Sequence, residues 1–152
     1  MIDNKSQMTT DTPRQVALAI LYQENKFLMQ LRDNIPGIVH PGVWGLFGGH
    51  IEAGETPLEA LQRELVEEID YHAPQLTEFY QDQQPTVIRH IFYGSLVVNL
   101  DQLTLNEGWD MGLVTPEEIE AGECYSQKAG MVRLLGRPHQ RIVLDFIASI
   151  SI

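Results

Sequence analysis

Glycine and proline are concentrated in one segment of the chain, and this segment limits the possible folds more than any other feature. Between residues 33 and 54 they occupy eight positions: Pro36, Gly37, Pro41, Gly42, Gly45, Gly48, Gly49 and Gly54. Both residue types interrupt regular structure, because proline lacks a backbone N–H and glycine is conformationally free. We therefore expect loops around one short strand in this segment.

A helix start follows the glycine-rich segment directly. Thr56 can cap a helix with its hydroxyl group, Pro57 suits the first helical position, and Glu59 stands where a capping-box carboxylate belongs. The sequence predicts a helix from residue 57 to about residue 69, with an acidic face beside an apolar face. The acidic residues, at positions i, i+3 and i+4, are Glu64, Glu67 and Glu68. The apolar residues are Leu58, Leu61, Leu65 and Ile69.

Three glutamates on one helix face repel one another. Exposed like charges at this spacing cost a few tenths of a kcal/mol per pair, and desolvation increases the cost. A divalent cation would offset the repulsion, since Mg²⁺ prefers carboxylate oxygens and leaves coordination positions for substrate phosphates. The alternative is an ordinary solvated helix face, and the three glutamates alone do not exclude it.

Apolar periodicity and turn residues predict the other elements. Strands are expected at residues 14–22, 26–31, 76–81, 86–98 and 111–114, the first two as a hairpin. A brief helix should follow Thr115 and end near Gly122, and a final helix should follow Pro138. This order of elements predicts an α+β fold in which a mixed sheet lies between helices.

Length and charge limit the number of domains and the classes of partner. A chain of 152 residues fits one domain; we expect residues 14–152 to form it and the polar residues 1–13 to be a flexible arm. The net charge of −11 argues against binding to nucleic acid or to anionic membranes. The single cysteine excludes an internal disulfide, and no apolar run reaches the roughly 20 residues of a membrane span, so a cytoplasmic location is expected.

The glycines and the acidic helix belong to one longer pattern. Its positions, read along the chain, are Gly49, Glu55, Arg63, Glu64, Leu65, Glu67 and Glu68. With these spacings, residues 49–71 resemble the signature box of the Nudix hydrolases. One fixed position differs, because Asp70 stands where that pattern has glycine. Phe47 also stands where many relatives carry proline before the paired glycines.

The resemblance implies a Nudix-type α/β/α sandwich and a hydrolase that uses Mg²⁺ or Mn²⁺. By this resemblance Glu67 and Glu68 would bind the metal together with the backbone carbonyl of Gly49. Glu64 would be either a third metal ligand or the general base that activates water. One sequence does not decide between these two roles.

The remaining expected site residues have supporting roles or contact substrate. Arg63 would orient the carboxylates and Glu55 would pair with it. Glu107 would be a further ligand or base, with an ordinary exposed loop residue as the alternative. The residues expected near substrate are Trp44, Phe47, Gly48 and His50. For the two aromatic residues, stacking on a nucleobase and packing in the core are equally open.

The expected function is that of a Mg²⁺-dependent pyrophosphohydrolase, which cleaves the diphosphate linkage of a nucleoside diphosphate joined to another moiety. An oxidised nucleoside triphosphate is one candidate substrate. ADP-ribose or a nucleotide sugar is an alternative, because Pro85 weakly resembles a marker of relatives that act on ADP-ribose. A domain that senses nucleotides without turnover is another alternative. Relatives often form dimers, so a homodimer is also expected.

Overall fold

The first two strands form the predicted hairpin. The computed structural model describes residues 12–38 and 41–150. Within them, β1 (Arg14–Gln23) pairs antiparallel with β2 (Lys26–Leu31). The turn between them consists of Glu24 and Asn25, with φ values of 53° and 62°. Two consecutive residues with positive φ match the right-handed twist of the strands, which explains the tight reversal.

Strand β1 is the centre of a seven-stranded mixed sheet. It pairs in parallel with β6 (Val87–Ser95) and antiparallel with β2 and with β4 (Phe47–His50). The outer strands are β5 (Thr77–Gln83) on β6, and β3 (Trp44–Gly45) and β7 (Asp110–Val114) on β2. Among the described strands β4 pairs only with β1.

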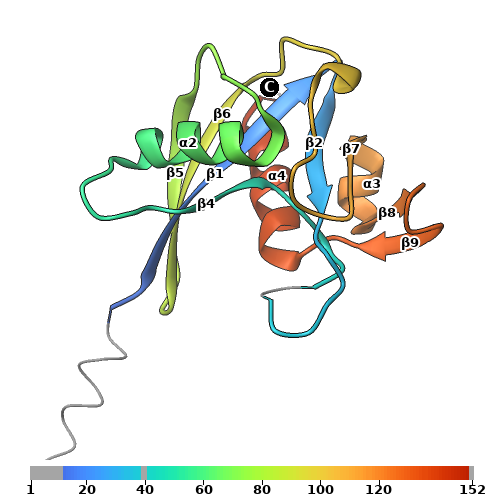
Figure 1. Ribbon diagram of the computed structural model, residues 1–152, viewed down its shortest axis with the longest axis horizontal. Coiled ribbons are helices and arrows are strands. Elements are labelled where there is room, and N and C mark those ends of the chain that lie inside the picture. Colours follow the sequence, from blue (N-terminus) through green and yellow to red (C-terminus); the bar gives the residue numbers. More distant parts are fainter. Residues whose placement is uncertain (1–11, 39–40, 151–152) are drawn as a thin grey trace, which may run out of the picture.

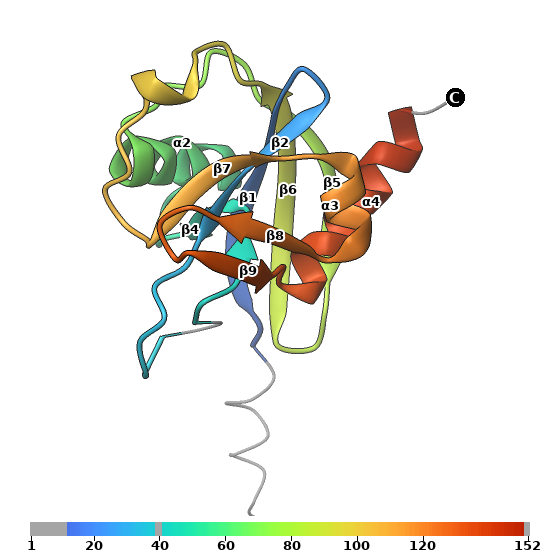
Figure 2. The same cartoon turned by 90° about the vertical axis from the view of Figure 1, so that its right-hand side faces the viewer.

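Helices cover both faces of the sheet (Figures 1 and 2). Helix α2 (Pro57–Ile69) packs on one face, and α3 (Pro116–Ala121) and α4 (Arg137–Ile150) pack on the other. Side chains of β1 alternate between the two layers, with Ala17 on the α2 side and Val16 and Leu18 on the α4 side. This arrangement confirms the predicted α+β sandwich with a mixed sheet between helices.

Two parts of the chain differ from the prediction. The glycine-rich segment contains two short strands, β3 and β4, instead of one. A second hairpin, formed by β8 (Glu123–Ser126) and β9 (Met131–Leu134), was not predicted. Its side chains Tyr125, Val132 and Leu134 are exposed. Because these exposed residues are themselves apolar, the sequence lacks the polar–apolar alternation typical of a half-buried strand. A short 3₁₀ helix, η1 (Leu100–Gln102), precedes β7.

Two further expectations concern the N-terminal arm and membrane-spanning helices. Residues 1–11 of the expected arm lie outside the described residues. In residues 12–38 and 41–150 we find no helix with the length and apolar character needed to cross a bilayer.

Helix α2 begins and ends as its sequence predicts. Thr56 accepts a hydrogen bond from the Glu59 N–H at 3.1 Å, and the Glu59 carboxylate accepts one from the Thr56 N–H at 2.9 Å. At the other end, Asp70 has φ 56° and ψ 41°, and its N–H donates to the carbonyls of Leu65 and Val66. Asp70 therefore occupies the left-handed position that glycine favours at a helix C-terminus.

Replacing Asp70 with Gly is expected to stabilise the protein by about 0.5 to 1 kcal/mol, since glycine adopts this conformation without Cβ strain. The melting temperature should rise by roughly 2 °C in a chain of this size. Asp70→Ala should have the opposite sign, because alanine lacks the local hydrogen bonding that lets aspartate tolerate positive φ. Thermal unfolding of the three proteins measures both effects. A lower melting temperature for Asp70→Gly would contradict the argument.

Candidate active site

Strand β4 brings the paired glycines under the acidic helix. In its register with β1, Gly48 lies opposite Leu18, and Gly49 opposite Ala17 on the side that faces α2. The space above Gly49 is filled by Glu64: a Cβ atom at residue 49 would lie 2.6 Å from the Glu64 carboxyl carbon. A larger residue at position 49 would displace the Glu64 carboxylate, so glycine at this spacing lets Glu64 lie over β4.

Glu68 is the most deeply buried carboxylate of α2, with 6% of the residue exposed. Its Oε1 accepts a hydrogen bond from the Gly48 N–H at 3.1 Å. Burial, followed by the charge of Glu64, raises the pKa of Glu68 to about 8. Burial also raises the pKa of Glu64 above its ordinary value, against the opposing effect of Arg63. Two carboxyl groups of raised pKa therefore lie together beside the glycine strand.

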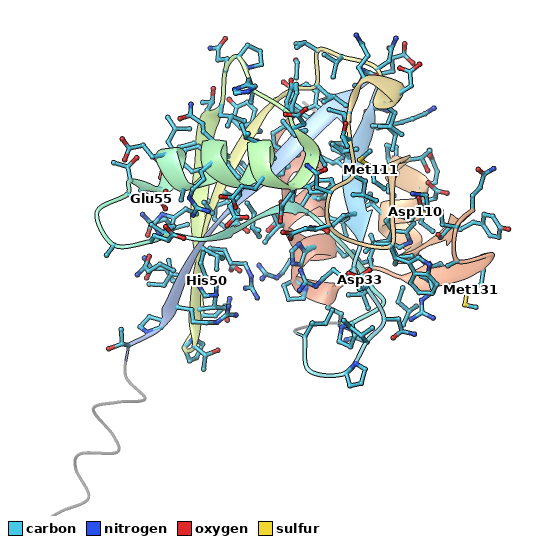
Figure 3. The ribbon with its side chains drawn as sticks, viewed as in Figure 1. Asp33, His50, Glu55, Asp110, Met111 and Met131 are labelled. Carbon is cyan, nitrogen blue, oxygen red and sulfur yellow. The ribbon has the colours of Figure 1, made fainter. Side chains whose placement is uncertain are left out.

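Arg63 connects most of the other acidic groups. Its Nε donates to Glu55 Oε2 at 2.7 Å, and its Nη1 donates to Glu64 Oε2 at 3.1 Å and to Glu67 Oε1 at 3.3 Å. Its Nη2 donates to the His50 carbonyl at 3.0 Å. Arg63 lowers the pKa of Glu55. Figure 3 shows Glu55 at the N-terminal end of α2 and His50 beneath it, at the end of β4. The structure thus brings Arg63 and Glu55 together as predicted.

Glu107 reaches the same site from a distant part of the chain. The loop before β7 docks on the end of α2, where the Asn106 N–H donates to the Glu68 carbonyl at 2.8 Å. Glu107 and Glu68 both line a cavity of about 160 Å³. After burial and Glu64, the charge of Glu107 is a further cause of the raised pKa of Glu68. Glu107 is exposed, but it lines the same cavity as Glu68 and so faces the carboxylate cluster formed by Glu64, Glu67 and Glu68.

The donor set of this cluster fits a hard divalent cation, although the side chains do not form a closed cage. In the part of the chain that the structure describes, no three acidic, histidine or cysteine side chains converge on one ion position. Glu67, which is 53% exposed, is turned toward Arg63. The buried Glu68 carboxylate receives one hydrogen bond, from Gly48, and its raised pKa indicates a poorly compensated charge. Carboxylate and carbonyl oxygens of this kind suit Mg²⁺ or Mn²⁺.

In the metal-free protein, Glu68 makes stability depend on pH. Its pKa is raised in the fold from 4.5 to about 8, so its contribution favours the folded state below about pH 4.5 and is lost as the pH rises through about 8. In EDTA, Glu68→Gln should therefore stabilise the protein at about pH 8 by up to about 4 kcal/mol relative to its effect at about pH 5. Thermal unfolding at the two pH values tests this. An equal effect of the substitution at both pH values would show that Glu68 is ionised throughout.

A second cavity, of about 190 Å³, adjoins the glycines on the α4 side of the sheet. We call it the arginine pocket, after Arg14, Arg32 and Arg89, which line it together with Gly48, His50 and His139. Arg32 lines both this pocket and the cavity at Glu68, so the two are adjacent. Nitrogen-bearing side chains gather below β4 between His50 and Asp33 in Figure 3. Gly48 and His50, expected near substrate, lie here.

The prediction for the two aromatic residues near the glycines needs correction. Trp44 is 2% exposed and Phe47 is fully buried. The Trp44 Nε1–H donates to the Cys124 carbonyl at 3.0 Å, and Phe47 packs with the apolar residues beneath α2. Both rings are core side chains without a free face, so neither stacks on a nucleobase in this structure. For both residues, packing in the core is the correct alternative.

Several residues of the arginine pocket were not among the predicted site residues: Arg14, Arg32, Arg89 and His139. His139 comes from α4, and its Nδ1 accepts a hydrogen bond from the Leu46 N–H at 2.9 Å, which fixes the turn between β3 and β4. For two of them the sequence offered one signal, the alternation of side chains along a strand. Arg14 is two residues from the buried Val16 and Arg89 is two residues from the buried Val87, so each arginine lies on the same face of the sheet as a buried valine.

Comparison with known proteins identifies the family. The model of the NUDIX domain matches residues 12–135. An 8-oxo-dGTP diphosphatase of Haemophilus influenzae is 35% identical over 98 residues, which are 62% of this chain and 72% of that protein. A Bacillus subtilis relative is 30% identical over 79 residues, 51% of this chain and 49% of that protein.

Solved structures share the fold. The MutT protein of Methanosarcina mazei Go1 superimposes with a TM-score of 0.71 at 20% identity, over 93% of this chain and 99% of that one. The NUDIX domain of Shewanella oneidensis NrtR, solved with ADP ribose, gives a TM-score of 0.68 at 15% identity, over 99% of this chain and 100% of that one. Because the family model matches most of this chain, the chain belongs to the NUDIX domain family and is a Nudix hydrolase.

Proposed function

We propose that this Nudix hydrolase is a Mg²⁺-dependent pyrophosphohydrolase that cleaves the diphosphate linkage of a nucleoside diphosphate joined to another moiety. The observation that carries the proposal is the buried Glu68 carboxylate, with its pKa raised to about 8, next to Glu64 and the paired glycines. A folded protein keeps such a carboxylate at a cost in stability. A divalent cation that binds a diphosphate would offset that cost.

An oxidised nucleoside triphosphate is the leading substrate. The Haemophilus influenzae relative, 35% identical over 98 residues, is an 8-oxo-dGTP diphosphatase. The adjoining arginine pocket supports an anionic substrate, since it places three guanidinium groups beside the carboxylate cluster. ADP-ribose is the second candidate, because the NrtR domain that binds it has the same fold.

In this reaction water attacks a phosphorus atom and the P–O bond to the bridging oxygen breaks. Glu67, Glu68 and the Gly49 carbonyl would hold the metal ion, which when bound supplies positive charge to the phosphate oxygens. Glu64 accepts the proton of the attacking water at Oε1, since its Oε2 accepts a hydrogen bond from Arg63 and burial raises its pKa. Arg63, itself held by Glu55, keeps Glu64 in place.

A turnover panel tests the proposal. Wild-type protein is incubated with 8-oxo-dGTP, unmodified nucleoside triphosphates, ADP-ribose, dinucleoside polyphosphates and nucleotide sugars, each with Mg²⁺, with Mn²⁺ and with EDTA. We expect metal-dependent release of a nucleoside monophosphate from at least one substrate, with the highest kcat/KM for an oxidised triphosphate. Binding of nucleotides without turnover across the panel would instead support the sensing domain.

A further inference from the structure

We infer that the arginine pocket is a subsite for a phosphate group that the substrate carries in addition to the diphosphate held at the carboxylates. This inference rests on the proposed function and makes its substrate class narrower. The extra phosphate has two possible sources with the same chemistry: the third phosphate of a nucleoside triphosphate, or a phosphate ester on the sugar of a dinucleotide-like substrate.

The charge of the pocket is opposite to that of the protein. The chain has a net charge of −11 and ten lysine and arginine residues, yet three of those ten line this one cavity. The described lining residues include no aspartate and no glutamate. Like charges in one cavity repel one another, and although Asp82 pairs with Arg89, a bound anion would offset the remaining repulsion. Arginine is the residue that best matches phosphate oxygens.

The sheet register aims the basic side chains at one place. Val16 in β1 lies opposite His50 in β4 and opposite Arg89 in β6, so these two residues flank it at the same level. With strands about 4.8 Å apart, the Cα atoms of His50 and Arg89 are about 10 Å apart, a span that two long side chains can close on a phosphate. Arg14 lies two residues along β1 on the same face, and its Nη1 contacts His50 Nε2 at 3.4 Å.

Arg89 is held in position by a buried carboxylate behind the pocket. Its Nη1 donates to Asp82 Oδ2 at 2.8 Å, and the two side chains are 11% and 4% exposed. Asp82 also accepts hydrogen bonds from Arg141 Nη2 at 3.1 Å and from Gln84 Nε2 at 3.0 Å. Together Asp82, Arg89 and Arg141 have a net positive charge, so Asp82 orients Arg89 without cancelling the positive charge of the group.

The size and the walls of the pocket favour a phosphate over a nucleobase. Its volume of about 190 Å³ is below the roughly 300 Å³ at which pockets for whole small molecules begin, so it suits one substituent. No phenylalanine, tyrosine or tryptophan is found among the described lining residues. Nucleobases are commonly held between such rings.

A substrate can reach both parts of the site at once. The carboxylate cluster lies on the α2 side of β4 and the arginine pocket on the α4 side. Between them, β4 carries glycine at two consecutive positions, Gly48 and Gly49, and the Gly48 N–H points away from β1 to Glu68. A chain of linked phosphates that crosses here would pass the Glu64 and Glu68 carboxylates, and Arg32 lines the cavities on both sides.

The test compares substrates that differ by one phosphate. The first pair is 8-oxo-dGTP and 8-oxo-dGDP, and the second is ADP-ribose 2′-phosphate and ADP-ribose. We expect the member with the extra phosphate to have at least a tenfold higher kcat/KM in one pair, and that pair identifies the source. Arg14→Met and Arg89→Met should each reduce this ratio at least fivefold. Arg137→Met, which removes an exposed arginine of α4 outside the pocket lining, should leave the ratio unchanged.

Ratios near one in both pairs, or ratios that respond equally to Arg14→Met and Arg137→Met, would overturn the inference. If no compound of the turnover panel is hydrolysed, the proposed function fails while the subsite can still be assessed. Calorimetric titration of wild-type protein with pyrophosphate in EDTA then decides. We expect one binding site whose affinity falls at least fivefold in Arg14→Met, whereas absent binding or an unchanged affinity would refute the subsite. Since Arg14 is exposed, its replacement is not expected to impair folding.

Discussion

Glu67→Gln and Glu68→Gln are each expected to reduce kcat/KM at least a hundredfold, a loss of roughly 3 kcal/mol of transition-state stabilisation. A neutral amide keeps the size of the side chain but removes the negative charge that would attract a divalent cation. Glu68 is bound to the glycine strand by the 3.1 Å hydrogen bond from the Gly48 N–H, so its replacement should also weaken binding of Mg²⁺. Steady-state rates together with calorimetric titration of Mg²⁺ measure the two effects separately.

Glu64→Gln should separate the two roles that the sequence leaves open for this residue. If Glu64 is the general base, the substitution should lower kcat and leave the affinity for Mg²⁺ within about threefold of the wild type. If Glu64 is a metal ligand, the substitution should lower both kcat and the affinity for Mg²⁺. The matched control is Glu120→Gln, which removes the same charge from an exposed position on α3. Activity that survives Glu67→Gln and Glu68→Gln at the level of this control would place the reaction elsewhere in the molecule.

Gly48→Ala is expected to destabilise the fold by about 3 kcal/mol or more, because two independent restrictions act on the same residue. Gly48 has φ +142°, in a region that residues with a Cβ rarely adopt. In addition, an added Cβ would overlap the carbonyl oxygen of Ala17 in the central strand. Since the backbone of β1 at Ala17 cannot move without disturbing its pairing with β4 and β6, relaxation is limited. Chemical denaturation measures the change in the free energy of unfolding.

Gly54→Ala is the matched control for this substitution. Gly54 also has positive φ, at +88°, but nothing lies within 4 Å of the added Cβ. Backbone strain alone should cost about 1 kcal/mol. If Gly48→Ala destabilises no more than Gly54→Ala, β1 and β4 do not approach each other as closely as described.

Most of the fold could be predicted because its elements carry local signals. The capping box at Thr56 and Glu59, and the hairpin between β1 and β2, depend on residues that are neighbours in the chain. The β8–β9 hairpin lacked such a signal, because its exposed positions carry apolar residues and its strands therefore show no polar–apolar alternation. The homodimer remains a prediction.

The same distinction applies to the candidate site: some of its residues could be predicted from local spacing and others could not. The three glutamates and Arg63 share one helix, so spacing alone places them together. Arg14 and Arg89 line the same pocket because β1 and β6 pair in parallel, and a parallel pairing between distant segments leaves no trace in residue spacing. The roles of Trp44 and Phe47 were undecided for a related reason: burial depends on what packs against a ring, and the packing partners come from other elements.

Helix α4 has a consequence for any attempt to work with a shortened protein. The match to the family ends at residue 135, before this helix begins at Arg137. Nevertheless α4 supplies His139, which fixes the turn leading into β4, and Arg141, which bonds to the carboxylate behind Arg89. A chain trimmed to the family boundary would keep every residue of the signature box but lose the side chains of α4 that support β4 and the arginine pocket.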